Sequence, residues 1–224
     1  LGRVRQLCVD GRVAYVTSRE DGLYLVDVST PARMKILAHY DTIELATGIA
    51  VSGEVAFVAC RTAGVELIDV SSPERPRHLS TIRTGEAQSI CVRNGILYVG
   101  VWAAGELVIC DVSDPYRPEV LSRSRLQGYG DGVDVRGDYC YVATGHHLRG
   151  VPHREATDPG YGRGHGLEVF EISDPRSPEF LGRVEFPPFY RLGMDMWSVR
   201  VTDRYAFVAD TYNGAFVVDI AEPH

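Results

Sequence analysis

The chain lacks the features that mark membrane-spanning and nucleic-acid-binding proteins. It contains no apolar run close to the roughly 20 residues that a membrane-spanning helix needs, so we expect no membrane span. Its 23 lysine and arginine residues are outnumbered by 30 aspartate and glutamate residues, which gives a formal net charge of −7. A protein that follows a phosphate backbone needs clustered basic residues. We therefore expect no nucleic-acid partner.

Cysteine pairs are missing too. The five cysteines include no Cys-x-x-Cys spacing, and Cys8, Cys91, Cys110 and Cys140 lie inside apolar strand patterns. Cysteines in such positions are typically small buried hydrophobic residues. The odd number and the burial together disfavour a secreted domain that is held by disulfide bonds.

Catalytic motifs of fixed spacing are absent as well. The sequence contains no HExxH, GxSxG, Walker or Rossmann pattern, and each of these would have indicated a particular reaction or cofactor. The catalytic residues are therefore unknown at this point, and enzyme activity remains an open alternative.

What the chain does contain is a fivefold internal repeat. Its first element reads Val-x-x-x-Φ-x-aromatic-Val, where Φ is apolar, and the copies begin at Val9, Val51, Val92, Val135 and Val201. Its second element runs to a proline, as in GLYLVDVSTP, and the copies end at Pro31, Pro73, Pro115, Pro175 and Pro223. Short runs in which apolar residues alternate with small or polar ones are typical of strands. Five copies predict five similar β units.

Each repeat predicts four short strands. Glycine-containing pairs such as Asp10-Gly11 separate the first two, as in tight hairpins, and proline ends the third because it cannot donate to the ladder. A fourth strand follows in four of the repeats, at residues 35–40, 77–82, 119–124 and 179–184. Four strands per period of about 42 residues predict an all-β fold. We expect residues 1–224 to form one β-propeller domain of five four-stranded antiparallel blades.

The second element carries a resemblance to a known family. Its segments LYLVDVS, VELIDVS, LVICDVS and FVVDIA resemble the motif of the LVIVD-repeat family, and the resemblance covers nearly the whole chain. It implies a β-propeller. Members are mostly bacterial or archaeal proteins, often surface-associated, without an agreed activity. The resemblance thus implies an extracellular or cell-surface location, whereas the unpaired cysteines argue against an oxidising compartment.

The fifth repeat ends at His224, after its third strand. Residues 1–4, Leu-Gly-Arg-Val, are identical to residues 181–184 of a predicted fourth strand. The identity predicts that the N-terminus supplies the outer strand of blade five and removes an open sheet edge. The spacing to the first repeat is too short for this, so either the identity is accidental or residues are missing between Val4 and Arg5.

The repeat is interrupted around blade four. Tyr141 and Glu171 are 30 positions apart, against 12 or 13 for the equivalent residues elsewhere, so about 18 extra residues lie between them. Six more follow the fourth strand of this blade. Strand direction predicts that both insertions, roughly 144–166 and 186–197, lie on one face. Long loops on one side of a rigid scaffold are where functional residues concentrate.

The insertions are rich in histidine, arginine and aromatic residues. The candidate ligand-binding residues are His146, His147, Tyr161, Arg163, Tyr190, Arg191 and Trp197, together with Trp102 in the equivalent loop of blade three. The candidate ligands of a divalent metal ion are His146, His153, His165 and Asp195, because imidazole and carboxylate groups bind such ions. The alternative is a pair of solvated loops whose histidines bind nothing.

These residues predict a rigid binding propeller. Its recognition surface would be the face that bears the insertions, and its partner a small molecule, a glycan or a protein. The alternative is a metal-assisted or His/Tyr acid–base enzyme, a hydrolase or a polysaccharide lyase, in which an insertion histidine acts as base or ligand and Tyr161 or Tyr190 as acid. An enzyme needs these side chains to converge in a pocket, whereas a binding surface does not.

Two further predictions concern structural carboxylates. Asp134 and Arg200 occupy equivalent positions in adjacent repeats, and we expect them to form a partly buried ion pair. A second set recurs at the end of the third strand and is expected to bind the turn that follows; it consists of Asp27, Asp69, Asp111 and Asp219.

Overall fold

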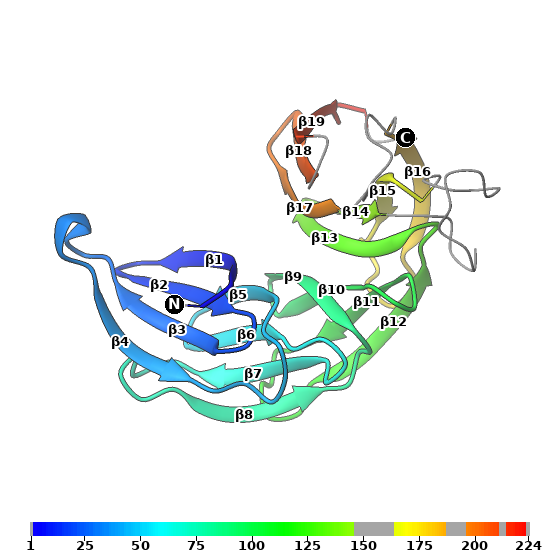
Figure 1. Cartoon of the computed structure of the whole chain (residues 1–224). Coiled ribbons are helices and arrows are strands. Elements are labelled where there is room, and N and C mark those ends of the chain that lie inside the picture. The colour runs from blue at the N-terminus through cyan, green and yellow to red at the C-terminus, as the bar shows by residue number, and fades with distance from the viewer. Residues whose placement is uncertain (1, 146–163, 187–195, 211–213, 223–224) are drawn as a thin grey trace. The chain divides into compact units, whose positions relative to one another are not determined.

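The computed structural model describes residues 2–145, 164–186, 196–210 and 214–222, which form five antiparallel β-sheets (Figure 1). Every sheet is built from strands that are consecutive in the chain. Among the described residues, the single helical element is the short 3₁₀ turn η1 (Pro31–Arg33). The sheets are the blades of a five-bladed β-propeller, as the repeat predicts.

The strands have the following bounds. Blade one contains β1 (Val4–Asp10), β2 (Val13–Ser18), β3 (Gly22–Asp27) and β4 (Lys35–Tyr40). Blade two contains β5 (Gly48–Ser52), β6 (Val55–Ala59), β7 (Val65–Asp69) and β8 (Arg77–Ile82). Blade three contains β9 (Ala87–Arg93), β10 (Ile96–Val101), β11 (Glu106–Asp111) and β12 (Glu119–Arg125). Blade four contains β13 (Tyr129–Arg136), β14 (Tyr139–Gly145), β15 (Gly166–Glu171) and β16 (Glu179–Glu185), and blade five contains β17 (Met196–Val201), β18 (Tyr205–Asp210) and β19 (Gly214–Asp219).

The predicted N-terminal closure is wrong. Val4 begins β1 and pairs with Ser18 of β2, and the backbone N–H of Gly2 donates to Asp21 in the same blade. In the part of the chain that the structure describes, the fifth sheet has the order β17-β18-β19 and includes no N-terminal strand. Val4 and Arg5 follow each other in one continuous strand, with a register shift before Gln6. Of the four matching residues, Gly2 and Val4 thus bind residues of blade one.

The chain divides into two compact units, residues 1–97 with 110–120 and residues 98–109 with 121–224. In the first unit, one core joins blades one and two, where Tyr15 and Leu25 pack with Ile49 and Val58. In the second unit, a core of the same construction joins blades four and five. The repeated aromatic residue of one blade therefore packs on aliphatic residues of the next. This contact accounts for the repeated aromatic residue in the second strands of blades one and four.

The recurrent carboxylates bind the turns after the third strands, as predicted. The backbone N–H groups of Ser29, Ser71 and Ser113 donate to Asp27, Asp69 and Asp111 at 2.9 Å. Glu171 and Asp219 accept in the same way from Ser173 and Ala221. Hydrogen bonds from Ser71 and the guanidinium of Arg77 lower the pKa of Asp69 to about 2. These five residues are therefore structural.

Asp134 links blades four and five, but through the backbone. Its Oδ2 accepts from the N–H of Val201 at 2.9 Å and its Oδ1 from the N–H of Val135. The Arg200 side chain is exposed and donates to the carbonyl oxygen of Val199. An amide donor satisfies the nearly buried carboxylate without a second buried charge, which would be costly to desolvate.

The structure contains no disulfide bond. All five cysteines lie among the described residues, and each is present as a thiol. Burial raises the pKa of the Cys60 thiol, beside the carboxylate of Glu66. Within the described ranges, no helix has the length and hydropathy needed to cross a membrane.

Candidate recognition site

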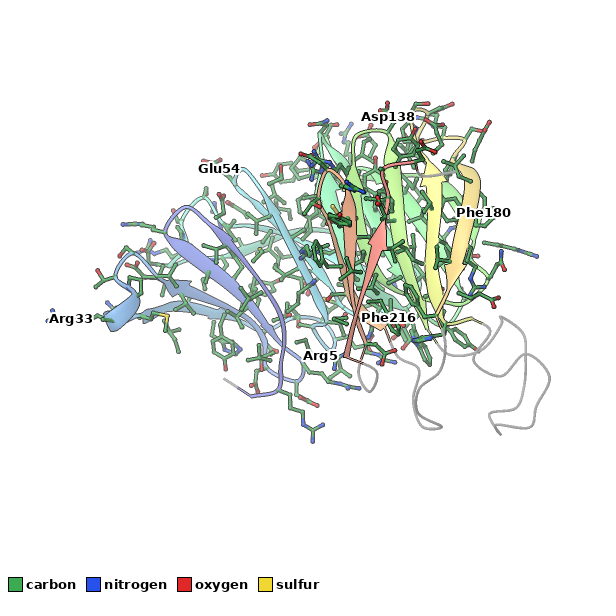
Figure 2. The ribbon with its side chains drawn as sticks, turned by 90° about the horizontal axis from the view of Figure 1, so that it is seen from above. Arg5, Arg33, Glu54, Asp138, Phe180 and Phe216 are labelled. Carbon is green, nitrogen blue, oxygen red and sulfur yellow. The ribbon has the colours of Figure 1, made fainter. Side chains whose placement is uncertain are left out.

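The first insertion begins and ends, and the second begins, at one end of blade four. Thr144 of β14 pairs with Gly166, the first residue of β15, and Gly166 pairs with Glu185, the last residue of β16. The hairpin between β13 and β14, which contains Asp138, lies at the opposite end of the blade from these residues (Figure 2). The roots that the two insertions have on blade four therefore lie side by side.

Most of the predicted site residues fall outside the part of the chain that the structure describes. These are His146, His147, His153, Tyr161, Arg163, Tyr190, Arg191 and Asp195. Trp197 lies in β17. The other two predicted residues, Trp102 and His165, are described together with their surroundings.

Trp102 forms an aromatic stack at the root of the first insertion. It lies in the loop between β10 and β11, and its ring stacks on that of Tyr129 with the centroids 4.9 Å apart and the planes inclined by 23°. Tyr129 pairs with Gly145, the last described residue before the insertion. Both side chains are partly exposed. An offset aromatic stack of this kind is a rigid surface with an apolar face.

His165 is a buried connector between blades four and five. Its Nε2 lies 2.5 Å from Oδ2 of Asp210 in β18, and its Nδ1 lies 3.2 Å from the carbonyl oxygen of Phe186. Both ring nitrogens therefore lie against protein oxygens. The rings of Phe186 and Phe216 stack on each other with their centroids 4.3 Å apart, and both contact the imidazole edge-on (Figure 2 labels Phe216).

Both ring nitrogens of His165 are occupied, and the other candidate metal ligands, His146, His153 and Asp195, lie outside the described residues. A metal ligand needs an unprotonated nitrogen, and here both nitrogens bind protein oxygens. The contact with Phe186, the first residue of the second insertion, continues the ladder of β15 and β16, since the N–H of Phe186 also donates to the carbonyl oxygen of His165. No cluster of three or more histidine, cysteine, aspartate or glutamate residues suited to a metal occurs among the described residues.

Glu168 anchors the link that leads into blade four. It is fully buried in β15, and its Oε1 accepts from the N–H groups of Gln127 and Gly128 at 2.9 and 3.3 Å. Burial raises the pKa of this carboxyl, and the two N–H donors oppose the rise. Among the described residues, no group donates to Oε2. The carboxylate holds the link on the strand that begins at the first insertion.

Sequence reasoning missed Glu168 and its counterpart in blade two. Glu66 is also fully buried, and it accepts from the Tyr40 hydroxyl at 3.2 Å and from the N–H of Ile43 at 2.9 Å. Both glutamates stand three residues before the recurrent carboxylate, in the segments GVELID and GLEVFE. A charged residue inside an otherwise apolar strand was the available signal, because such a residue is buried only when it has partners.

Sequence comparison identifies the repeat. The family model described as the LVIVD repeat matches residues 1–42, 45–83, 84–123, 127–148 and 193–224. The gap between residues 148 and 193 contains most of the first insertion and half of the second. No curated protein matches the sequence.

Solved structures share the fold at low identity. The computationally designed Ika8 protein is 10% identical with a TM-score of 0.66 over 96% of this chain and 58% of its own. A protein of unknown function from Desulfotomaculum acetoxidans is 12% identical with a TM-score of 0.73, and the match covers 97% of this chain and 66% of its own. A chain of the nidogen/laminin complex is 16% identical with a TM-score of 0.65, and the match covers 97% of this chain and 76% of its own. The chain thus spans less than two thirds of the first two, and the likeness establishes the fold alone.

Proposed function

The chain belongs to the LVIVD-repeat family, and from this premise we propose that it is a binding propeller. Its recognition surface is the end of blades four and five that bears the two insertions. A β-propeller supports a binding or scaffolding role in general, because a rigid array of blades presents loops in a constant geometry. The position of the insertions selects one end of that array.

The observation that carries this proposal is the stack of Trp102 on Tyr129. The pair is partly exposed and lies at the root of the first insertion. An aromatic platform binds ligands that have a flat apolar face, such as a sugar ring or an aromatic ring. The arginines, histidines and tyrosines of the insertions would add the polar contacts that orient such a ligand.

The surroundings of the platform favour a constant geometry. Glu168 ties the preceding link to β15, and the pair of His165 and Asp210 ties β15 to β18. Binding surfaces that need no rearrangement lose less free energy to ordering when the ligand arrives. The buried charged groups at this end therefore act as supports and not as contact residues.

Tryptophan fluorescence tests the proposal directly. The chain has two tryptophans, Trp102 and Trp197, and both are candidate site residues. We expect neutral or anionic oligosaccharides to change the emission when they bind. Replacing residues 146–163 by the three-residue loop of blade one, residues 19–21, should abolish the change, and Trp102→Ala should weaken binding.

Tyr116→Ala provides the matched control. Tyr116 is 69% exposed and lies in the turn that follows β11, whereas Trp102 lies in the loop that precedes this strand. This variant should bind as the wild type does. Unchanged affinity in the loop-shortened variant would contradict the proposed location.

A further inference from the structure

The link between blades three and four, residues 126–128, joins the two rings of the aromatic platform. The N–H of Leu126 donates at 2.8 Å to the carbonyl oxygen of Gly105, in the loop that carries Trp102. Tyr129, the other ring of the stack, follows the link directly and is the first residue of β13. A change in the backbone of this link would therefore move one ring relative to the other.

One buried carboxylate holds this link on blade four. Glu168 is fully buried, and its Oε1 accepts from the N–H groups of Gln127 and Gly128. Hydrogen bonds to a charged acceptor are roughly twice as strong as those between neutral groups. The strength with which the link is held therefore depends on whether Glu168 is ionised.

The link also packs on the root of the first insertion. The hydroxyl of Thr144, before the insertion, donates at 2.7 Å to the carbonyl oxygen of Gly164, after it. A Cβ atom added at Gly128 would lie 2.2 Å from the same oxygen. The link and the insertion root are thus in direct contact, so a change at Glu168 reaches the platform and the insertion together.

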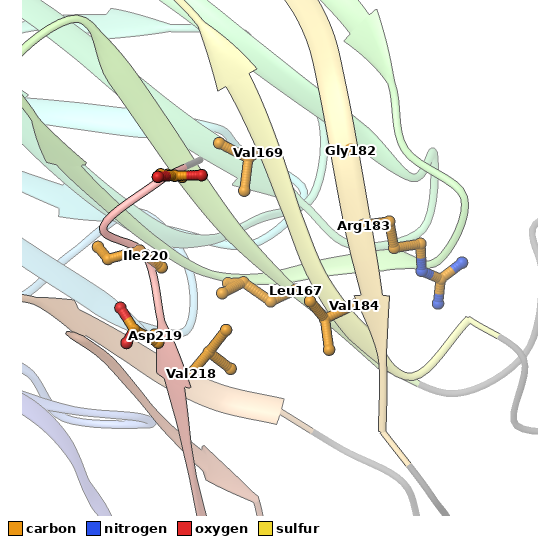
Figure 3. Close-up of a pocket in the computed structure, with 9 residues that line it drawn as sticks. Leu167, Val169, Gly182, Arg183, Val184, Val218, Asp219 and Ile220 are labelled. Carbon is orange, nitrogen blue, oxygen red and sulfur yellow. The ribbon is translucent and has the colours of Figure 1, made fainter. Parts of the chain in front are cut away.

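The charged neighbour of Glu168 is Arg183. The two residues are paired in the ladder of β15 and β16, so their side chains share one face of the blade. Figure 3 shows the Arg183 side chain directed away from those of Leu167 and Val184, which belong to the opposite face. The guanidinium also donates to Oε1 of the Gln127 side chain at 3.1 Å. It therefore lies beside the link as well.

Opposing influences set the ionisation of Glu168. Burial raises its pKa and is the largest of them. The positive charge of Arg183 from β16 and the N–H groups of Gln127 and Gly128 lower the pKa, and Thr144 faces the carboxyl from β14. Arg183 is the charged member of this set. No described residue donates to Oε2, so this oxygen can take up a proton without losing a hydrogen bond.

We propose, resting on the proposed function for the role of the platform, that Glu168 is a proton switch for the recognition site. With Glu168 ionised, the link keeps Trp102 and Tyr129 in the stack that receives the ligand. When Oε2 takes up a proton from solvent, the two N–H bonds weaken and the stack opens. Ligand affinity should therefore fall as the pH falls through the pKa of Glu168, and a bound ligand should lower that pKa by linkage.

Blade two contains a carboxylate of the same kind without a platform. Glu66 accepts from the N–H of Ile43 in the link between blades one and two. Leu45 stands two residues further along this link, at the place that Tyr129 has after the link to blade four. Glu66→Gln is therefore the matched control for the same change at Glu168.

The test needs no ligand, because Trp102 reports on the stack itself. Trp197→Phe leaves Trp102 as the single tryptophan of the chain. In this background we expect the emission maximum to move to longer wavelength as the pH falls from about 8 to about 4, a range that includes raised values of a glutamate pKa. It should move towards the emission of Tyr129→Ala, which has no stack. Glu168→Gln has no titrating group at this position and should remove the transition.

The control and the folded state of the blades decide how the titration is interpreted. Glu66→Gln should keep the transition, and the far-ultraviolet circular dichroism should stay constant across the titration. The proposal is overturned if Trp102 shows no transition, if Glu168→Gln retains it or if Glu66→Gln abolishes it. A loss of circular dichroism over the same pH range would also overturn it, because unfolding would then move the ring.

Oligosaccharide binding separates the switch from the proposed function. An oligosaccharide that binds at the high-pH end should lose affinity by about tenfold across the Trp102 transition, because two hydrogen bonds to a charged acceptor are weakened. Affinity that does not change with pH would overturn the switch and leave the proposed function intact. A transition of Trp102 without binding of any neutral or anionic oligosaccharide would contradict the proposed function and support the switch.

Discussion

Removing Asp210 should destabilise the junction of blades four and five because it takes away the hydrogen-bond partner of a buried histidine. Both side chains are fully buried, and Nε2 of His165 and Oδ2 of Asp210 are 2.5 Å apart. The other ring nitrogen faces the carbonyl oxygen of Phe186, so among the described residues the ring has no second carboxylate partner. Asp210→Ala therefore leaves Nε2 of His165 buried without its partner.

The expected loss follows from the burial of the pair. Leaving a buried polar group without its hydrogen-bond partner costs about 1–3 kcal/mol. For a chain of this size the melting temperature falls by about 2–4 °C per kcal/mol, so Asp210→Ala should lower it by roughly 2–12 °C. His165→Phe combined with Asp210→Ala removes both polar groups and places a third aromatic ring beside Phe186 and Phe216. This double variant should be more stable than Asp210→Ala, because it leaves no polar group of the pair without a partner.

Urea unfolding followed by far-ultraviolet circular dichroism measures the wild type and both variants. The informative comparison is between Asp210→Ala and the double variant. If the double variant is no more stable than Asp210→Ala, the argument from the unpartnered imidazole fails and the loss comes from packing alone. A wild-type stability for Asp210→Ala would show that the contact contributes nothing to stability.

Three further predictions concern other buried side chains and closely packed glycines. Glu66→Gln should lower the free energy of urea unfolding by about 1–3 kcal/mol because donors occupy both carboxylate oxygens. Glu168→Gln should lower it by less than about 1 kcal/mol because no described group donates to Oε2, and equal losses would contradict this reasoning. Because the pKa of Glu168 is raised, stability should fall as the pH rises from about 4.3 through the folded-state pKa of this group. Because the pKa of Asp69 is lowered to about 2, stability should also fall as the pH drops below about 3.9 towards 2. In a plot of stability against pH, Glu168→Gln should flatten the first fall and Asp69→Asn the second. Gly128→Ala should lower the free energy of unfolding by about 1–3 kcal/mol, because the added Cβ would lie 2.2 Å from a carbonyl oxygen. Gly182→Ala is the control and should fold normally, because its Cβ would meet no heavy atom within 4 Å. Similar melting temperatures for the two variants would contradict this steric argument.

The blades could be predicted from the sequence because every local signal repeats. Alternation, hairpin glycines and strand-ending prolines coincide in each copy, and the predicted fourth strands 35–40 and 77–82 match β4 and β8 residue for residue. The function of Asp69 in its turn was also predictable, since a carboxylate that recurs in every blade serves the blade. Such inferences need no knowledge of distant contacts.

The site was harder because its contacts join residues far apart in the chain. His165 and Asp210 are 45 positions apart, and no local pattern links them. The insertion directed attention to His165 as a ligand, but burial and two acceptors made it a connector. The prediction for the N-terminus was wrong because it relied on a short local identity of four residues. The structure instead pairs Val4 with Ser18 in the first hairpin.

The packing of aromatic on aliphatic faces gives the array a direction. Tyr15 of blade one packs on Ile49 and Val58 of blade two, and Tyr141 of blade four packs on Val199 and Val208 of blade five. The two surfaces in each of these contacts are unlike, so at both junctions one blade presents its aromatic face and the next presents its aliphatic face. Duplication of a blade in register would therefore create a new junction that is already complementary. The same property means that a chain of such blades can lengthen or shorten during evolution by whole repeats, while its remaining junctions keep their contacts.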